Sequence, residues 1–141
     1  MAIERITAKG QLVPLYFYQD AVADAQTNVQ LSVNENAGAA IHLVDGYTMP
    51  FPGSVVAVTA DLDAAGSAGS LTVGASIGGT EDADTTLTIT TETTKKKVVG
   101  RRLAEFAAGA IIGAEITTAS WNGTTSDLLV VVWVILQLEN I

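Results

Sequence analysis

Few side chains in this sequence are of types that catalyse reactions. His42 is the one histidine, so a Ser–His–Asp triad would have to form around it with Asp45 or a more distant acid. One imidazole cannot supply the several ligands of a histidine zinc site, and the absence of cysteine removes thiolate metal sites and cysteine nucleophiles. We therefore expect His42 to be hydrogen-bonded or to lie on a strand surface, and we expect neither enzyme activity nor a cofactor.

Two groups of acidic residues are further candidates for a catalytic or metal site. Asp61 and Asp63 flank Leu62 and would share one face of a strand, as a pair of glycosidase carboxylates might. The segment 81–84, Glu-Asp-Ala-Asp, offers oxygen atoms to Ca²⁺ but lacks the spacing and the glycine of an EF-hand loop. We expect solvated acids beside turns in both places, and Ca²⁺ binding at 81–84 stays open as an alternative.

The two tryptophans have different surroundings. Trp121 lies in the loop-like segment 120–123, Ser-Trp-Asn-Gly, and is the candidate for an exposed platform that stacks on a sugar. Trp133 lies within the apolar segment 128–136, where we expect it in the core or in a subunit interface. We therefore assign Trp133 as a possible residue of an interface between subunits.

Charge is unevenly distributed along the chain. The 141 residues include 7 Lys and Arg and 15 Asp and Glu, for a net charge of −8, and ten of the acids lie between residues 10 and 94 without any Lys or Arg. Such an acidic body repels phosphate backbones, so we expect no binding to nucleic acid. A basic cluster follows, which is either a solvated turn or an electrostatic contact with an acidic neighbouring protein such as an identical subunit. It comprises Lys95, Lys96, Lys97, Arg101 and Arg102.

The hydropathy pattern is that of β-strands. Polar and apolar residues alternate strictly at 28–33 and 86–90, which places one face on a core and the other in water. Further strands are predicted at 55–62, 71–77, 111–118 and 128–138, and a short helix is possible at 101–108. We expect 55–62 and 71–77 to pair as a hairpin across the Gly- and Ser-rich loop 63–70. The sequence thus predicts one all-β domain, a jelly-roll-like β-sandwich.

The segment 128–136 is apolar at successive positions, so a strand there would be covered on both faces, by its own core and by another surface. Its apolar run is far shorter than the roughly 20 residues that cross a bilayer, and we expect no contact with membranes. Only 16% of all residues are charged, against an average of about 25%. Both features indicate that interfaces occupy much of the surface.

The apolar residues at the start of the chain have neither the spacing of a helix nor the clean alternation of a strand. Pro14 is incompatible with a central strand, so we expect an extended N-terminal arm at 1–14 and a β-sandwich domain at 15–141. The arm carries the side chains that we expect to contact a neighbouring protein: Ile3, Arg5, Ile6, Lys9 and Leu12.

Four segments occur in an order that resembles the jelly-roll capsid decoration (cement) proteins of tailed bacteriophages. They are 52–56 (Pro-Gly-Ser-Val-Val), 68–73 (Ala-Gly-Ser-Leu-Thr-Val), 106–118 from Phe106 to Thr118, and 127–134 from Asp127 to Val134. The resemblance extends over residues 50–140 and implies a non-enzymatic homotrimer on the outer surface of the virion. There it would bind the major capsid protein between hexamers and bridge neighbouring capsomers.

Two other functions remain as alternatives. A trimeric jelly-roll binding module, such as a phage fibre head or a carbohydrate-binding domain, would present an exposed aromatic or polar pocket near Trp121. A small β-fold enzyme would need a pocket in which His42 meets two acids.

Overall fold

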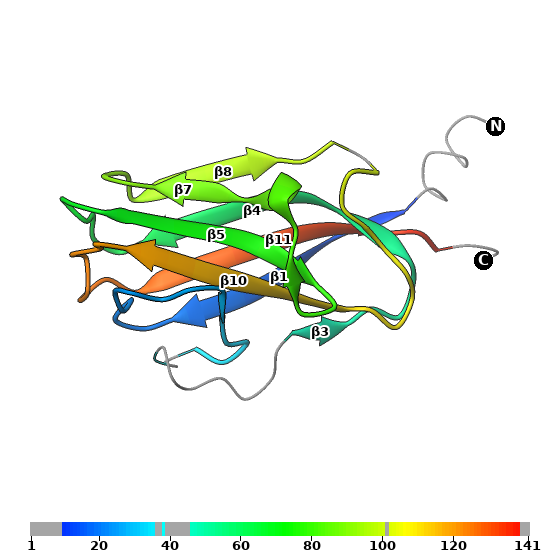
Figure 1. The fold of residues 1–141 in the computed structure, drawn as a ribbon. Coiled ribbons are helices and arrows are strands. Elements are labelled where there is room, and N and C mark those ends of the chain that lie inside the picture. Colours follow the sequence, from blue (N-terminus) through cyan, green and yellow to red (C-terminus); the bar gives the residue numbers. More distant parts are fainter. Residues whose placement is uncertain (1–9, 36–37, 39–45, 101, 139–141) are drawn as a thin grey trace.

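The chain folds into two antiparallel β-sheets that pack face to face (Figure 1). The computed structural model describes residues 10–35, 38, 46–100 and 102–138. Sheet A contains, in order, β1 (Gln11–Gln19), β11 (Leu128–Leu136), β4 (Gly53–Leu62) and β8 (Thr94–Val98), and β9 (Glu105–Phe106) also pairs with β4. Sheet B contains β2 (Val29–Gln30), β10 (Ile111–Ala119), β5 (Ser70–Ile77) and β6 (Thr80–Glu81), with β3 (Tyr47–Thr48) on β10 and β7 (Leu87–Ile89) on β5. The 3₁₀-helix η1 (Ala83–Thr85) links β6 to β7.

The strand order is that of a jelly roll. Apart from the short additions β3, β6 and β9, sheet A has the order first, eighth, third, sixth along the chain, and sheet B has second, seventh, fourth, fifth. The connections therefore pass repeatedly from one sheet to the other, as in two interleaved Greek keys. This order confirms the all-β, jelly-roll-like sandwich that the sequence predicts.

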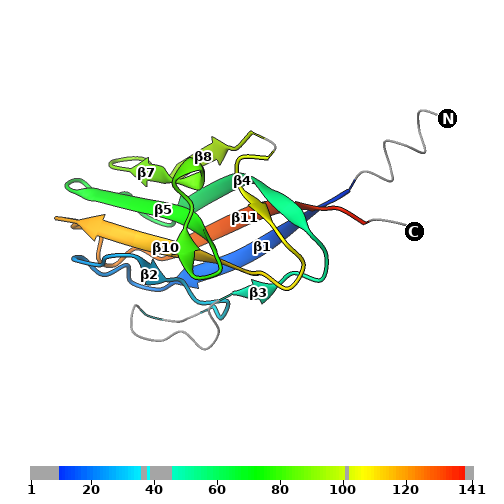
Figure 2. The same cartoon turned by 45° about the vertical axis from the view of Figure 1, so that its right-hand side comes forward.

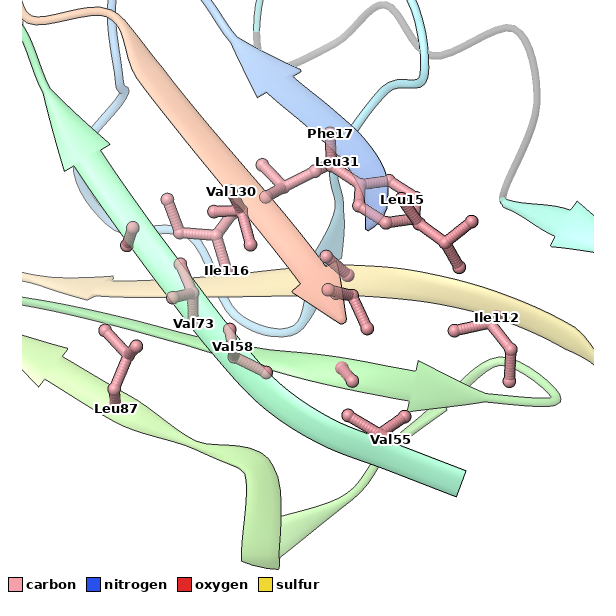
Figure 3. Packing of buried hydrophobic residues seen from close by; sticks show 14 of the residues in the cluster. Leu15, Phe17, Leu31, Val55, Val58, Val73, Leu87, Ile112, Ile116 and Val130 are labelled. Carbon is pink, nitrogen blue, oxygen red and sulfur yellow. The ribbon is translucent and has the colours of Figure 1, made fainter. Parts of the chain in front are cut away.

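The core lies between the two sheets. Phe17, Val58 and Val130 from sheet A face Val73 and Ile116 from sheet B, and all five side chains are inaccessible to solvent (Figure 3). Because every second residue of these strands points inward, the alternating pattern in the sequence selects the core face. Burial of each such side chain contributes about 1.5–3 kcal/mol to the hydrophobic stabilisation.

Strand β1 is an edge strand of sheet A and begins at Gln11, paired with Leu136. The expected boundary between arm and body at residue 14 thus falls inside a strand, and Leu12 and Pro14 belong to the sandwich. Proline is compatible with this strand because an edge strand uses only one side of its backbone for pairing. The remaining arm residues, 1–9, lie outside the described residues.

Three other expectations about elements need correction. Strands β4 and β5 do not form a hairpin, because they belong to different sheets and pair with β11 and β10 respectively. The predicted helix at 101–108 is absent from its described part, 102–108, which forms a turn followed by β9. The basic residues at 95–97 lie in a strand, β8, rather than in a turn. No described helix is long and apolar enough to cross a membrane.

A pair of buried glutamines closes one end of the sandwich. The side-chain amides of Gln19 and Gln26 donate to each other's oxygen atoms at 2.9 and 2.7 Å, and both residues are buried. The backbone N–H of Gln26 donates to Oγ1 of Thr118 on β10, at 3.0 Å. These contacts join the end of β1 to sheet B.

We expect the substitution Gln19→Leu to lower the free energy of unfolding by about 1–3 kcal/mol, because it leaves the buried Gln26 amide without its partner. Urea unfolding followed by circular dichroism measures the change. Gln11→Leu on the same strand is the matched control, because Gln11 is exposed. Equal unfolding midpoints for the two variants would show that the amide pair does not stabilise the fold.

Candidate interaction surface

The outward face of β11 is apolar although no part of the described chain forms a second core on it. Val130, Val132 and Val134 point into the sandwich, whereas Val131 and Trp133 between them point outward. Val131 is buried but is not part of the core cluster, because neighbouring outward side chains cover it. The sequence-based expectation that this strand is apolar on both faces is therefore confirmed.

Strands β1, β11, β4 and β8 lie in this order across sheet A (Figure 2). Their register places the outward side chains in rows that run from β1 to β8. We call these positions the outer face of sheet A. The rows are Pro14–Trp133–Ala57–Val98, Tyr16–Val131–Thr59–Lys96 and Tyr18–Leu129–Asp61–Thr94, with Leu12–Ile135 beyond the first row.

The outer face of sheet A changes from apolar to polar in two directions, across the strands and along them. Trp133 lies in a row without any polar side chain, and its neighbours across the strands are Pro14 and Ala57. The β1 side of the face is apolar and aromatic, with Leu12 at 55% and Tyr16 at 44% exposure. Val98, at 72% exposure, extends the apolar row to the opposite edge. Polar and charged side chains begin only toward β8 and toward the end of the sheet where β4 stops.

The outer face of sheet B is polar on its two central strands, although Ser76 and Glu115 on this face are themselves buried. Its outward positions on the two central strands include Thr72 and Ser76 on β5 and Glu115 and Thr117 on β10. An antiparallel sheet with one face in water alternates apolar and polar residues in this way. The apolar outer face of sheet A is therefore a property of that sheet and not of the whole sandwich.

The basic cluster is divided by the structure. Nζ of Lys95 donates to the carbonyl oxygen of Thr88 at 2.6 Å and lies 3.4 Å from Oε1 of Glu92, so this lysine links β8 of sheet A to β7 of sheet B. Lys96 and Lys97 are exposed and form no ion pair with any described residue. We call β8 with these two side chains the lysine edge.

The two arginines of the cluster lie beyond β8. Arg102 is exposed in the turn before β9 and has a φ of 72°. Arg101 lies outside the described residues. Residues 95–102 therefore do not form one surface, and Lys96 is the described lysine on the outer face of sheet A, because Lys97 pairs with the inward-facing Val58.

Acidic residues gather at the end of sheet A where β1 and β4 stop and β11 begins. A pocket of about 380 Å³ there is lined by Tyr18, Asp20, Glu35, Asp61, Leu62, Asp63, Asp127, Leu128 and Leu129. We call this the acidic end. Partial desolvation, with the charges of Asp127 and Glu35, raises the pKa of Asp20.

The acids of this end also have structural tasks. Oδ1 of Asp127 accepts the backbone N–H of Ala21 at 2.9 Å, and Oδ1 of Asp63 accepts that of Asp127 at 2.8 Å. Asp61 is on β4, whereas Asp63 follows it in a loop, so the two do not form a pair on one strand face. Within the described residues, no three acidic or histidine side chains are placed to hold a metal ion.

Trp121 is buried, contrary to the expectation of an exposed platform. Only 2% of it is accessible, and its backbone N–H donates to Oδ1 of Asp24 at 2.8 Å. The ring lies against Gly66 and Gly123; a Cβ atom at Gly66 would come within 2.6 Å of the indole. The glycines at positions 66 and 123 thus leave space for the ring.

Two glutamates lie side by side on the outer face of sheet B. Glu115 is 4% exposed and accepts a hydrogen bond from Nε2 of Gln30 at 2.8 Å. Glu81 lies over Gly74, and its Oε2 atom is buried without a hydrogen-bond partner. Burial raises the pKa of both carboxyl groups, and the charge of Glu81 raises that of Glu115 further. The segment 81–84 is therefore a short strand and η1, not a fully solvated loop.

These raised pKa values make part of the stability depend on pH. The protonated forms are favoured in the folded state, so their contribution is full below the unfolded-state pKa and is lost as the pH rises through the folded-state pKa. We expect Glu115→Gln to raise the thermal midpoint at pH 7 and to have little effect below about pH 4, where the carboxyl is protonated in both states. Differential scanning calorimetry across this range, with exposed Glu105→Gln as control, measures the difference; a pH-independent difference would contradict it.

The remaining expected site residues lie outside the described part of the chain. These are the single histidine and four members of the arm: His42, Ile3, Arg5, Ile6 and Lys9. Of the expected contact residues, the structure brings Leu12 and Trp133 onto one surface, the outer face of sheet A, with Lys96 at its edge.

Sequence reasoning missed Tyr16, Leu129 and Ile135 as members of this face. The doubly apolar segment 128–136 contained the signal for Leu129 and Ile135, but Tyr16 required the pairing of β1 with β11. Compared with known proteins, the sequence matches no protein-family model and no curated protein.

Proposed function

We propose that this chain is a structural protein of the virion, a trimeric decoration (cement) protein that binds the outside of an icosahedral phage capsid. It would contact the major capsid protein and stabilise the shell by bridging neighbouring capsomers. Two findings support this proposal: the order of sequence segments resembles that of such proteins, and the chain has the jelly-roll fold that the resemblance implies.

The observation that carries the proposal is the apolar outer face of sheet A. Contiguous exposed apolar surface of this kind marks interaction sites in proteins that otherwise keep such residues in a core. A decoration protein needs surfaces for its sister subunits and for the shell, and that requirement matches the low charged fraction of 16%. The net charge of −8 favours a protein partner over nucleic acid.

The mechanism is mechanical rather than catalytic. Three linked copies engage the shell together, so that each weak contact is strengthened by the other two. A ligand that binds only the assembled shell stabilises it by mass action. The alternative of a carbohydrate-binding module depended on an exposed Trp121, and that side chain is buried.

The test is to add the purified protein to empty heads of the phage whose genome encodes it and to image them by electron cryo-microscopy. We expect density in groups of three copies on the outer surface at three-fold or quasi-three-fold positions, together with a higher thermal midpoint of the shells. Bare outer surfaces at saturating protein would refute the proposed function.

A further inference from the structure

We propose that the outer face of sheet A binds a second copy of this chain, with the neighbour's lysine edge against the acidic end of the face. This inference rests on the proposed function insofar as it assigns one face of the sandwich to the contact within the trimer. It names the surface, the partner and the charged groups involved, and it can be tested without any capsid.

Hydrophobic surface supplies the driving force. Leu12, Tyr16 and Val98 are 55%, 44% and 72% exposed, and they surround the partly buried Trp133 and the covered Val131. A large aromatic side chain in the middle of an apolar patch, ringed by smaller contacts, is the usual composition of an interface centre. Burial on a partner removes this apolar area from water at about 25 cal/mol per Å².

The size of the face suits a protein partner. Strands β1, β4 and β11, of nine or ten residues at about 3.3 Å per residue and about 4.8 Å apart, cover about 30 Å by 14 Å, and the five residues of β8 add about 80 Å². The projected area is therefore about 500 Å², and side-chain relief makes the accessible area larger. A standard protein interface takes about 800 Å² from each partner, so the face is of the right order for one contact.

Charge identifies the partner as the same chain. Lys96 lies at one edge of the face, and Lys97 projects from the other side of the same edge strand, opposite the inward-facing Val58. Asp20, Asp61 and Asp127 lie at the end of the face, so the two charges occupy separate places on one molecule. A second copy supplies lysines to the acids of the first, and this opposes the repulsion between two chains of net charge −8. When such a head-to-tail contact closes on itself, it generates a ring such as a trimer.

The test is the mass in solution of the full chain and of single variants, measured by size-exclusion chromatography with light scattering. We expect the parent at three times the 14.6 kDa chain mass, and Tyr16→Glu and Leu12→Glu to dissociate at concentrations at least tenfold higher than the parent. Leu103→Glu is the matched control, since Leu103 is 59% exposed but does not belong to the face.

The contribution of the charged contacts is tested by charge reversal and by salt. Lys96→Glu combined with Lys97→Glu weakens the association, and the parent dissociates at higher protein concentration in 500 mM than in 50 mM NaCl because salt screens exposed charges. Circular dichroism of each variant separates dissociation from unfolding, since Tyr16, Leu12 and both lysines are exposed in the single chain.

Three results would overturn the inference: a monomeric parent at 100 µM, an unchanged mass for both Tyr16→Glu and Leu12→Glu, or equal dissociation by Leu103→Glu. If this face instead binds a capsid or another partner, the parent will be monomeric at 100 µM, which is the first of these results. Failure of capsid binding by a parent that is trimeric in solution would instead count against the proposed function and leave the contact between copies intact.

Discussion

On the proposed function, we expect Tyr16→Glu to lower the apparent affinity for the capsid by about 10²- to 10⁴-fold, because the variant would present single chains in place of three linked copies. Linked copies bind with a second and third contact that are effectively intramolecular, so their loss removes avidity without changing any contact with the shell. Tyr16 is chosen because it is 44% exposed on β1 and is not required for the core. Sedimentation of heads with labelled protein over a range of concentrations measures the change.

Leu103→Glu is again the control, since it adds the same charge at an exposed position away from the outer face of sheet A. We expect it to bind heads as the parent does. If monomeric Tyr16→Glu bound heads with the affinity of the parent, attachment would not depend on the trimer. The bridging mechanism would then be wrong even though the protein binds capsids.

Phe17→Ala will lower the free energy of unfolding by about 3–5 kcal/mol, the range expected when a fully buried phenylalanine leaves a cavity. Phe17 is completely buried, and its ring meets Tyr47 edge-to-face with centroids 5.6 Å apart and an interplanar angle of 74°. Domains of this kind have a total stability of about 5–15 kcal/mol, so the variant will be close to unfolding at 37 °C.

Urea unfolding at 25 °C measures this loss against Phe51→Ala. Phe51 is 39% exposed, so its removal leaves no enclosed cavity, and we expect a much smaller change. Equal losses for the two variants would show that β1 is not anchored by Phe17. A Phe17→Ala variant with unchanged stability would also show that Phe17 does not anchor β1. The rest of the sandwich would then be stable without the contacts of this edge strand.

The local hydropathy pattern was sufficient to predict most of the long strands, whereas the two strictly alternating segments, 28–33 and 86–90, contain only the short strands β2 and β7. The segments 111–118 and 128–138 correspond to β10 and β11, and 55–62 lies within β4. Pairing was not predictable in the same way, because β4 and β5 follow each other in sequence yet belong to opposite sheets. In a jelly roll the partner of a strand is set by long-range packing, which leaves no local trace in the sequence.

Two strands were missed for physical reasons. In β8 three lysines occur in succession, which resembles a solvated run, but charged residues are typical of edge strands because they discourage pairing with other chains. In β1 the proline suggested an irregular arm, whereas only a central strand is incompatible with it. Both edges of sheet A therefore carry sequence features that oppose further strand addition.

The candidate surface was predictable in part. Trp133 and the apolar segment around it indicated an interface before the fold was known, because no single core can cover both sides of one strand. Trp121 was misread, since its burial depends on Gly66, which is distant in sequence and leaves space for the ring. The acidic end likewise required the fold, which brings Asp20, Asp61 and Asp127 together from three strand ends.

The position of β11 also determines when sheet A can form during synthesis. This strand lies between β1 and β4 and pairs with both, yet it is the last strand of the described chain. At about 5–20 residues per second, the ribosome needs on the order of ten seconds to proceed from β1 to β11. During that interval β1 and β4 lack their common partner. We expect Pro14 to limit aggregation during this interval, because a proline in the still unpaired β1 hinders the pairing of β1 with the same segment of a neighbouring nascent chain.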